Sequence, residues 1–180
     1  MNLLLGIMSG IILKDIKIMI KWFKIYKNQY LGVFFLGFAF FVLQELPYII
    51  MPFIPLSSNP IMNMTESSVF LNVVEKIVGS LSVAFLILIV NKNEKWFSLS
   101  NWKEKLFFSL AIVMIVINFG GWIAYYSGYQ TYAIMLICLV AAVPLYYMFL
   151  GLWRKNYPLV IVSILFLIVH VMHVAFNFFL

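Results

Sequence analysis

The stretch PLVIVSILFLIVHVMHVAFNFFL, residues 158–180, decides the fold class of this chain. It is long and apolar enough to cross a bilayer as a helix, for which about 20 such residues suffice. It also carries both histidines of the protein, His170 and His173, in helical register with Asn177. An ionisable side chain inside a membrane is costly unless it faces protein or water, so these residues are candidates for function.

The composition of the whole chain is that of a membrane protein. Hydrophobic residues make up 65% of the 180 residues and charged residues only 10%, whereas a soluble domain carries about a quarter charged residues. The length leaves room for about five crossings of roughly 20 residues each. We therefore predict an all-α fold, a polytopic transmembrane bundle of five helices over residues 31–180, with no separate soluble domain.

Four further apolar stretches precede the last one. Prolines predict irregular helices in two of them. Pro47 predicts a kink or an unwound outer end in the first crossing, and Pro144 predicts a kink in the fourth. The single cysteine, Cys138, excludes an internal disulfide, and we expect a buried, inert thiol. The five predicted crossings are Leu31–Ile54, Val69–Val90, Leu106–Tyr126, Thr131–Leu150 and Pro158–Leu180.

The first 30 residues differ from the rest because lysines recur at every third or fourth position. Lys14, Lys17, Lys21, Lys24 and Lys27 share one helical face, and apolar residues cover much of the remainder. This spacing predicts a basic amphipathic helix over residues 1–30 that lies in the inner membrane interface and is attracted by anionic lipids. Alternatively, the lysines only flank the first crossing and set its topology. No positive charge precedes the first apolar run, so we do not expect a cleaved signal.

The basic residues also predict the orientation of the chain. Five of them precede the first crossing, four lie between the second and third, and two lie between the fourth and fifth, while the other two loops carry none. Positive residues accumulate on the cytoplasmic side of membrane proteins. We therefore predict the amino terminus inside, the carboxyl terminus outside, and the cell membrane as the location of this multi-pass protein.

This orientation places the polar side chains of four helices at one level. With a rise of about 1.5 Å per residue, they lie about 18 to 22 Å from the cytoplasmic helix ends or further out, whereas the inner half is almost purely apolar. The pattern predicts a polar pocket in the outer half of the bundle. Its candidate residues are Glu45, Glu75, Asn118, His170, His173 and Asn177.

Such a set of side chains permits several kinds of chemistry. Carboxylates and neutral imidazoles are ligands that zinc and similar divalent metals accept, and His170 and His173 at positions i and i+3 can face one ion. The candidate metal ligands are these two histidines with Glu45 and Glu75. The same groups could act as general acid and base, bind a cation, relay protons, or hold the helices together.

Two short motifs in the last stretch resemble those of a known family. Phe166–His170 has the form FxxxH and His173–Asn177 the form HxxxN. They resemble motifs of the intramembrane CAAX-protease and bacteriocin-processing family, whose members include bacteriocin self-immunity proteins. The resemblance covers about a dozen residues, and it implies a hydrolase or an immunity protein. The chain departs from the family where Lys76 follows Glu75 in place of a second glutamate, and where both histidine motifs share one helix.

We expect a small non-enzymatic binding, transport-accessory or immunity-type membrane protein, because this class explains the crossings, the basic inner surface and the outward polar layer without requiring a nucleophile or a complete metal motif. Its partner would be a small ligand reached from the external side or another membrane protein. The first alternative is an intramembrane metal-dependent or acid/base hydrolase, and the second is a structural subunit whose polar groups only join helices. Nucleic-acid binding is not expected, because the basic residues follow the membrane topology. Frequent Ile, Lys, Asn and Phe are typical of a bacterial protein.

Overall fold

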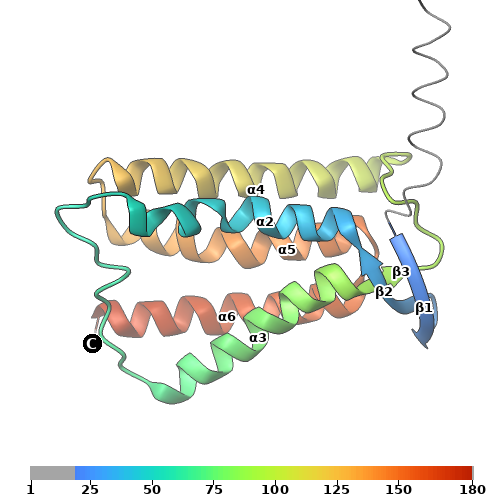
Figure 1. Ribbon diagram of the computed structural model, residues 1–180, viewed down its shortest axis with the longest axis horizontal. Coiled ribbons are helices and arrows are strands. Elements are labelled where there is room, and N and C mark those ends of the chain that lie inside the picture. Colours follow the sequence, from blue (N-terminus) through green and yellow to red (C-terminus); the bar gives the residue numbers. More distant parts are fainter. Residues whose placement is uncertain (1–18, 180) are drawn as a thin grey trace, which may run out of the picture.

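A computed structural model describes residues 19–179 and shows a bundle of helices closed at one end by a small sheet (Figure 1). The helices are α2 (Phe35–Ile50), α3 (Val69–Leu88), α4 (Trp102–Tyr126), α5 (Ala142–Trp153) and α6 (Tyr157–Phe179). A 3-10 turn, η1 (Met51–Phe53), continues α2, and a π-helical segment, η2 (Ile134–Ala141), precedes α5. The strands β1 (Met19–Tyr26), β2 (Gln29–Phe34) and β3 (Ile89–Asn91) form an antiparallel sheet in the order β1-β2-β3.

Five helical segments of the described residues are long and apolar enough to cross a membrane, which confirms the predicted number. Most of their bounds lie close to the predicted ones, with two exceptions. The first crossing begins at Phe35 and not at Leu31, because residues 31–34 belong to β2. α4 begins at Trp102, four residues before the predicted Leu106. The early start of α4 follows from its N-cap, where the backbone N–H of Glu104 donates to Oδ1 of Asn101 at 2.9 Å. The five segments are Phe35–Phe53, Val69–Leu88, Trp102–Tyr126, Ile134–Trp153 and Tyr157–Phe178.

Residues 19–34 form a hairpin where an amphipathic helix was predicted, so for residues 19–30 that prediction is wrong. The remainder of the predicted helix, residues 1–18, lies outside the described residues. Aromatic and β-branched residues favour strands in this segment, and Lys27 takes a positive φ of 45° in the turn. The third strand, β3, pairs with β2 through Gln29 and Asn91. That long-range pairing leaves no trace in the local spacing of the lysines.

The predicted proline effects take two forms. α2 passes through Pro47 and unwinds into η1 only after Ile50, so the irregularity is at its end. The fourth crossing instead contains the π-helical segment η2 before Pro144. At the end of this segment, the backbone N–H of Ala142 donates to the carbonyl of Ile137, five residues earlier. Cys138 lies within this segment and is half-buried.

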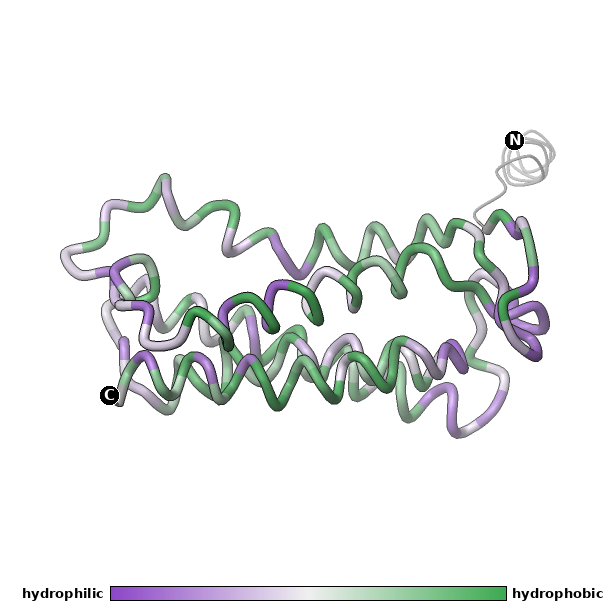
Figure 2. Tube along the Cα trace, turned by 90° about the horizontal axis from the view of Figure 1, so that it is seen from below, coloured by the Kyte–Doolittle hydropathy of each residue, from purple (hydrophilic) through white to green (hydrophobic). Residues whose placement is uncertain are grey.

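Nine of the ten Lys and Arg side chains in the described residues belong to the sheet, to the segment before α4, to the start of α4, or to the turn after α5. We call this the basic end, and Figure 2 shows hydrophilic residues gathered there. Lys155 pairs with Glu94 at 2.6 Å, and this hydrogen bond raises the pKa of Lys155. The Arg154 guanidinium is buried and donates to the carbonyl of Lys95, and burial lowers its pKa to about 10. These contacts tie the helix ends to the sheet.

The opposite end of the bundle, here the far end, holds residues 54–68, the turn at 127–130 and the last turn of α6 (Figure 1). Two groups of buried apolar side chains stabilise the bundle. One includes Phe34, Tyr147 and Trp153 and extends to the basic end. The other includes Met51, Trp122 and Met135, which belong to elements near the far end.

Candidate functional site

Glu75 on α3 joins both histidines of α6. Its Oε1 lies 3.0 Å from Nδ1 of His170, and its Oε2 contacts Nδ1 of His173. The spacing of three residues turns both imidazoles to the same face of α6. One turn away from Glu75, Gly79 allows α3 to approach, since a Cβ there would lie 3.3 Å from the Phe166 ring. Three predicted site residues from two helices are thus in direct contact.

The other nitrogen of His173, Nε2, lies next to one hydrogen-bond acceptor and one hydrogen-bond donor. Nε2 lies 3.0 Å from Oε1 of Glu66 and 3.0 Å from Nδ2 of Asn177. The backbone N–H of Ser67 donates to Oδ1 of Asn177 at 2.8 Å, which fixes the orientation of this amide. A carboxylate only accepts a hydrogen bond, whereas an amide NH₂ only donates one. Nε2 therefore has a partner in Glu66 when it carries a proton and in Asn177 when it does not.

Glu66 was not among the predicted site residues. It lies in a loop of the far end and its side chain is 35% exposed, so no intramembrane position drew attention to it. The hydrogen bond with His173 is the main cause that lowers the pKa of Glu66. The sequence does distinguish Glu66 in one respect, because it is the only charged residue between the first two predicted crossings.

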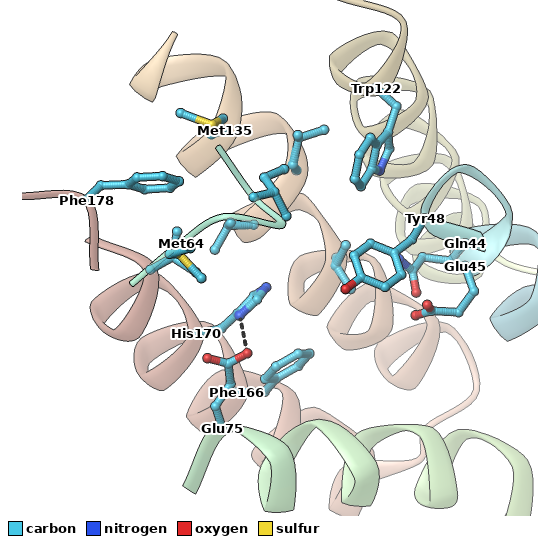
Figure 3. A pocket seen from close by; sticks show the side chains of 15 residues that line it. Gln44, Glu45, Tyr48, Met64, Glu75, Trp122, Met135, Phe166, His170 and Phe178 are labelled. Carbon is cyan, nitrogen blue, oxygen red and sulfur yellow. Dashed lines mark ion pairs between the residues drawn. The ribbon is translucent and has the colours of Figure 1, made fainter. Parts of the chain in front are cut away.

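A central cavity of about 310 Å³ lies between the helices (Figure 3). Apolar and aromatic side chains form most of its wall. Its carboxylate and imidazole members are Glu45, Glu75 and His170, and Figure 3 shows the two glutamates on different sides of it. The lining residues are Gln44, Glu45, Tyr48, Ile61, Met64, Glu75, Trp122, Met135, Leu139, Val140, Val143, Phe166, His170, Val174 and Phe178.

The Glu45 carboxylate is half-buried at this wall. Within residues 19–179 it has neither a hydrogen-bond nor an ion-pair partner. The neighbouring wall residue Tyr48 meets Trp122 edge to face, with ring centroids 6.1 Å apart. A carboxyl group without a protein partner therefore lies beside aromatic rings in a cavity that is otherwise mostly apolar.

Residues 54–68, here the roof loop, cover the cavity at the far end, because Ile61 and Met64 are part of its wall. The Tyr125 hydroxyl holds the middle of this loop. It accepts from the backbone N–H of Ile61 at 3.2 Å and donates to Oδ1 of Asn59 at 2.7 Å. Ser67 bound to Asn177 and Glu66 bound to His173 hold the end of the loop.

A smaller cavity of about 240 Å³ lies beside the central one. Both cavities have Glu45, Glu75, Val143 and Phe166 in their walls. Lys76 and Ser80 also line the smaller one, and both are exposed on α3. The two glutamates can thus be approached along the side of the bundle between α2 and α3.

The six predicted pocket residues do not share one pocket. Glu45, Glu75 and His170 line the central cavity, whereas His173 contacts Glu75 and Asn177 holds the roof loop. Asn118 lies elsewhere. It is 1% exposed, and its Nδ2 donates to the carbonyl of Cys138 at 3.0 Å and lies 3.4 Å from that of Leu139.

Asn118 has a structural reason for this position. Pro144 has no backbone N–H to donate, and it follows the π-helical segment that contains Cys138 and Leu139. The Asn118 amide supplies a donor at this break. Sequence reasoning assigned Asn118 to the pocket because its depth matched, but depth does not fix the direction in which a side chain points.

The four predicted metal ligands do not converge on one point. In the part of the chain that the structure describes, no group of three or more His, Cys, Asp or Glu side chains is arranged to hold a metal ion. Both Nδ1 atoms face the oxygens of Glu75, and Glu45 lies on another side of the cavity (Figure 3). The geometry gives ion pairs where the sequence suggested a zinc site.

No known protein family matches this chain, and neither a curated protein sequence nor a solved structure matches it.

Proposed function

We propose that this membrane protein binds a small, partly apolar organic cation in the central cavity and acts as a binding, transport-accessory or immunity-type protein without catalysis. The single observation that carries the proposal is the unpartnered Glu45 carboxylate at an aromatic cavity wall. A charge away from water is costly unless a counter-charge pairs with it. An organic cation supplies that charge.

The remaining wall suits both parts of such a ligand. Most of its side chains are apolar and can contact the apolar part. The charged part is attracted to the faces of tryptophan and tyrosine rings, and Trp122 and Tyr48 are both in the wall. The volume of about 310 Å³ falls at the lower end of small-molecule pockets, which measure about 300 to 1,000 Å³. The smaller cavity supports entry from the bilayer between α2 and α3, a route open to a molecule that partitions into lipid.

Binding is tested with benzyltrimethylammonium and its uncharged isostere neopentylbenzene, titrated into the detergent-solubilised full chain in a calorimeter. We expect Glu45→Gln to weaken binding of the cation by on the order of tenfold, about 1.4 kcal/mol, and to leave the isostere unchanged. Glu45→Asp keeps the charge and serves as the matched control. Equal affinity of the cation for the parent chain and Glu45→Gln, or no binding to the parent chain, contradicts the proposal.

The acid/base hydrolase is the second candidate, because the Glu75–His170 pair lines the cavity. A carboxylate that holds one nitrogen of an imidazole can orient the other nitrogen as a base. Figure 3 shows the ring of His170 directed into the cavity. Hydrolysis would depend on His170, whereas cation binding depends first on Glu45. If the protein is a hydrolase, His170→Gln abolishes its activity. If it binds a cation, Glu45→Gln weakens binding more than His170→Gln does.

The orientation of the protein is part of the proposal. The basic end would face the cytoplasm and its anionic lipids, and the exposed Trp22, Trp96 and Trp102 at this end suit the membrane interface. The amino terminus would then be inside, the carboxyl terminus outside, and the cavity in the outer half. In a Cys138→Ala background, a membrane-impermeant thiol reagent should label Ser57→Cys from outside intact cells and should not label Lys103→Cys. The reverse pattern would overturn the orientation.

A further inference from the structure

We propose that Glu66, His173, Glu75 and His170 form a proton path between the far-end surface and the central cavity, so that entry of a cation is exchanged for a proton. The inference rests on the proposed function for its ligand. It adds a second activity, the movement of protons, to a site that would otherwise only bind.

The first support is a line of titratable groups that lie next to one another, here the proton path. Glu66 lies 3.0 Å from Nε2 of His173, and Nδ1 of His173 contacts Glu75. Glu75 lies 3.0 Å from Nδ1 of His170, which is buried and has no hydrogen-bond partner among the described residues. The exposed fraction of the side chain falls from 35% at Glu66 to 6% at His173 and is 20% at Glu75. The path therefore begins at the surface, passes through a buried imidazole and ends at the cavity wall.

The second support is the pair of neighbours at Nε2 of His173. Glu66 accepts from this nitrogen when it is protonated, and Asn177 donates to it when it is not. A buried imidazole with a partner in only one protonation state would be held in that state, because an unpartnered buried polar group is costly. His173 has a partner in both states, so it can change between them without such a loss.

A proton moves along the path without any other reactant. Protonated Glu66 gives its proton to Nε2 of His173, and Nδ1 of the same ring gives its proton to Oε2 of Glu75. Rotation of the Glu75 carboxyl group then turns this proton toward Nδ1 of His170, which accepts it once its ring turns to meet it, and Nε2 of His170 releases one into the cavity. Each group gains and loses one proton, and the reverse sequence carries a proton outward.

The charges around the path determine the direction of the linkage. Glu45 on α2 lines the same cavity, Lys76 on α3 acts on Glu66, and η2 presents only apolar side chains such as Met135 and Leu139 to the cavity. A cation beside Glu45 and Glu75 repels a proton on the path. Binding of the cation should therefore release a proton and become tighter as the pH rises.

The affinity of benzyltrimethylammonium for the full chain is measured by calorimetry between pH 5 and 8, where histidines titrate, in two buffers of different ionisation enthalpy. We expect release of about one proton per bound cation and affinity that rises up to about tenfold per pH unit. His173→Asn and Glu66→Gln should each reduce this rise to less than about threefold. Ser67→Ala is the matched control, since it touches the same loop contact without removing a titratable group.

Two results overturn the inference. One is binding by the parent chain without proton release. The other is parental pH dependence in both variants, which would show that the released proton does not come through Glu66 and His173. If the parent chain does not bind the probe, the proposed function fails, and the path is tested separately by magnetic resonance. Only two histidines are present, so labelled imidazoles give two titration curves. Glu66→Gln removes the carboxylate next to Nε2 of His173 and should therefore shift the midpoint of the His173 curve. An unchanged midpoint rejects the path.

Discussion

At the scale of single residues, the site depends on which atoms of a side chain are already engaged. Glu75 uses both carboxylate oxygens on imidazoles, whereas Glu45 uses neither on any described residue. Two glutamates in one cavity wall therefore have different roles. The first is held in place by protein contacts, and the second is available to a ligand.

Glu66 provides a pH test of the roof loop. Hydrogen bonding to His173 lowers its pKa below the usual 4.5, so the stabilisation is fully present above that value and is lost as the pH falls through the lower, folded-state pKa. Hydrogen exchange of residues 61–68, corrected for intrinsic rates, should therefore be faster at a pH below this folded-state pKa than at pH 5.

The turn at residues 127–130 is the internal control, because Ser127 donates to the carbonyl of Ile123 and no carboxylate takes part. Its corrected exchange should be the same at both pH values. Glu66→Gln should show fast exchange of the roof loop already at neutral pH. Roof-loop exchange that does not respond to acid or to this substitution would show that Glu66 does not anchor the loop.

At the scale of elements, close approach of backbones decides how α4 and η2 pack. Gly121 faces η2, and a Cβ there would lie 2.4 Å from Cβ of Cys138. Its neighbour Gly120 has open space, with nothing within 4 Å of the same atom. The two adjacent glycines therefore form a matched pair of test positions.

Gly121→Ala should destabilise the folded chain by about 1 to 3 kcal/mol, because overpacking forces the helices apart. Gly120→Ala should be neutral or should stabilise the chain by up to about 1 kcal/mol, because alanine favours a helix more than glycine does. Thermal unfolding in one detergent, followed by tryptophan fluorescence, compares the two variants. Equal melting temperatures would contradict the packing of α4 on η2.

The elements also show what the sequence can predict. Runs of about 20 apolar residues predict the five membrane-length helices directly. The i, i+3 spacing likewise predicts that His170 and His173 lie on one face of their helix. The hairpin of residues 19–34 could not be recognised in this way. Its lysines fit a helical spacing, but pairing of β2 with β3, about 60 residues later, selects the strand. Contacts so distant along the chain have no local signature.

At the scale of the whole molecule, the two ends of the bundle differ in chemistry. The basic end is fixed by the sheet, by Arg154 and by the Lys155–Glu94 pair. The far end has few charges, and its roof loop lies over a cavity whose wall holds carboxylates. The depth of the polar residues predicted their common level, but it did not separate Asn118, which contacts a helix break, from Glu45, which faces the cavity.

The most direct test of cation binding is a solid-state magnetic resonance distance in lipid bilayers. The distance is measured between the ¹⁵N nucleus of labelled benzyltrimethylammonium and the ¹³C-labelled carboxylates of the full chain. The signal that disappears in Glu45→Gln is assigned to Glu45. We predict a separation of about 6 Å or less, the range of cation contacts with aromatic rings and nearby charges. Dipolar coupling to no carboxylate, or coupling that persists unchanged in Glu45→Gln, would contradict the proposal that Glu45 holds the ligand.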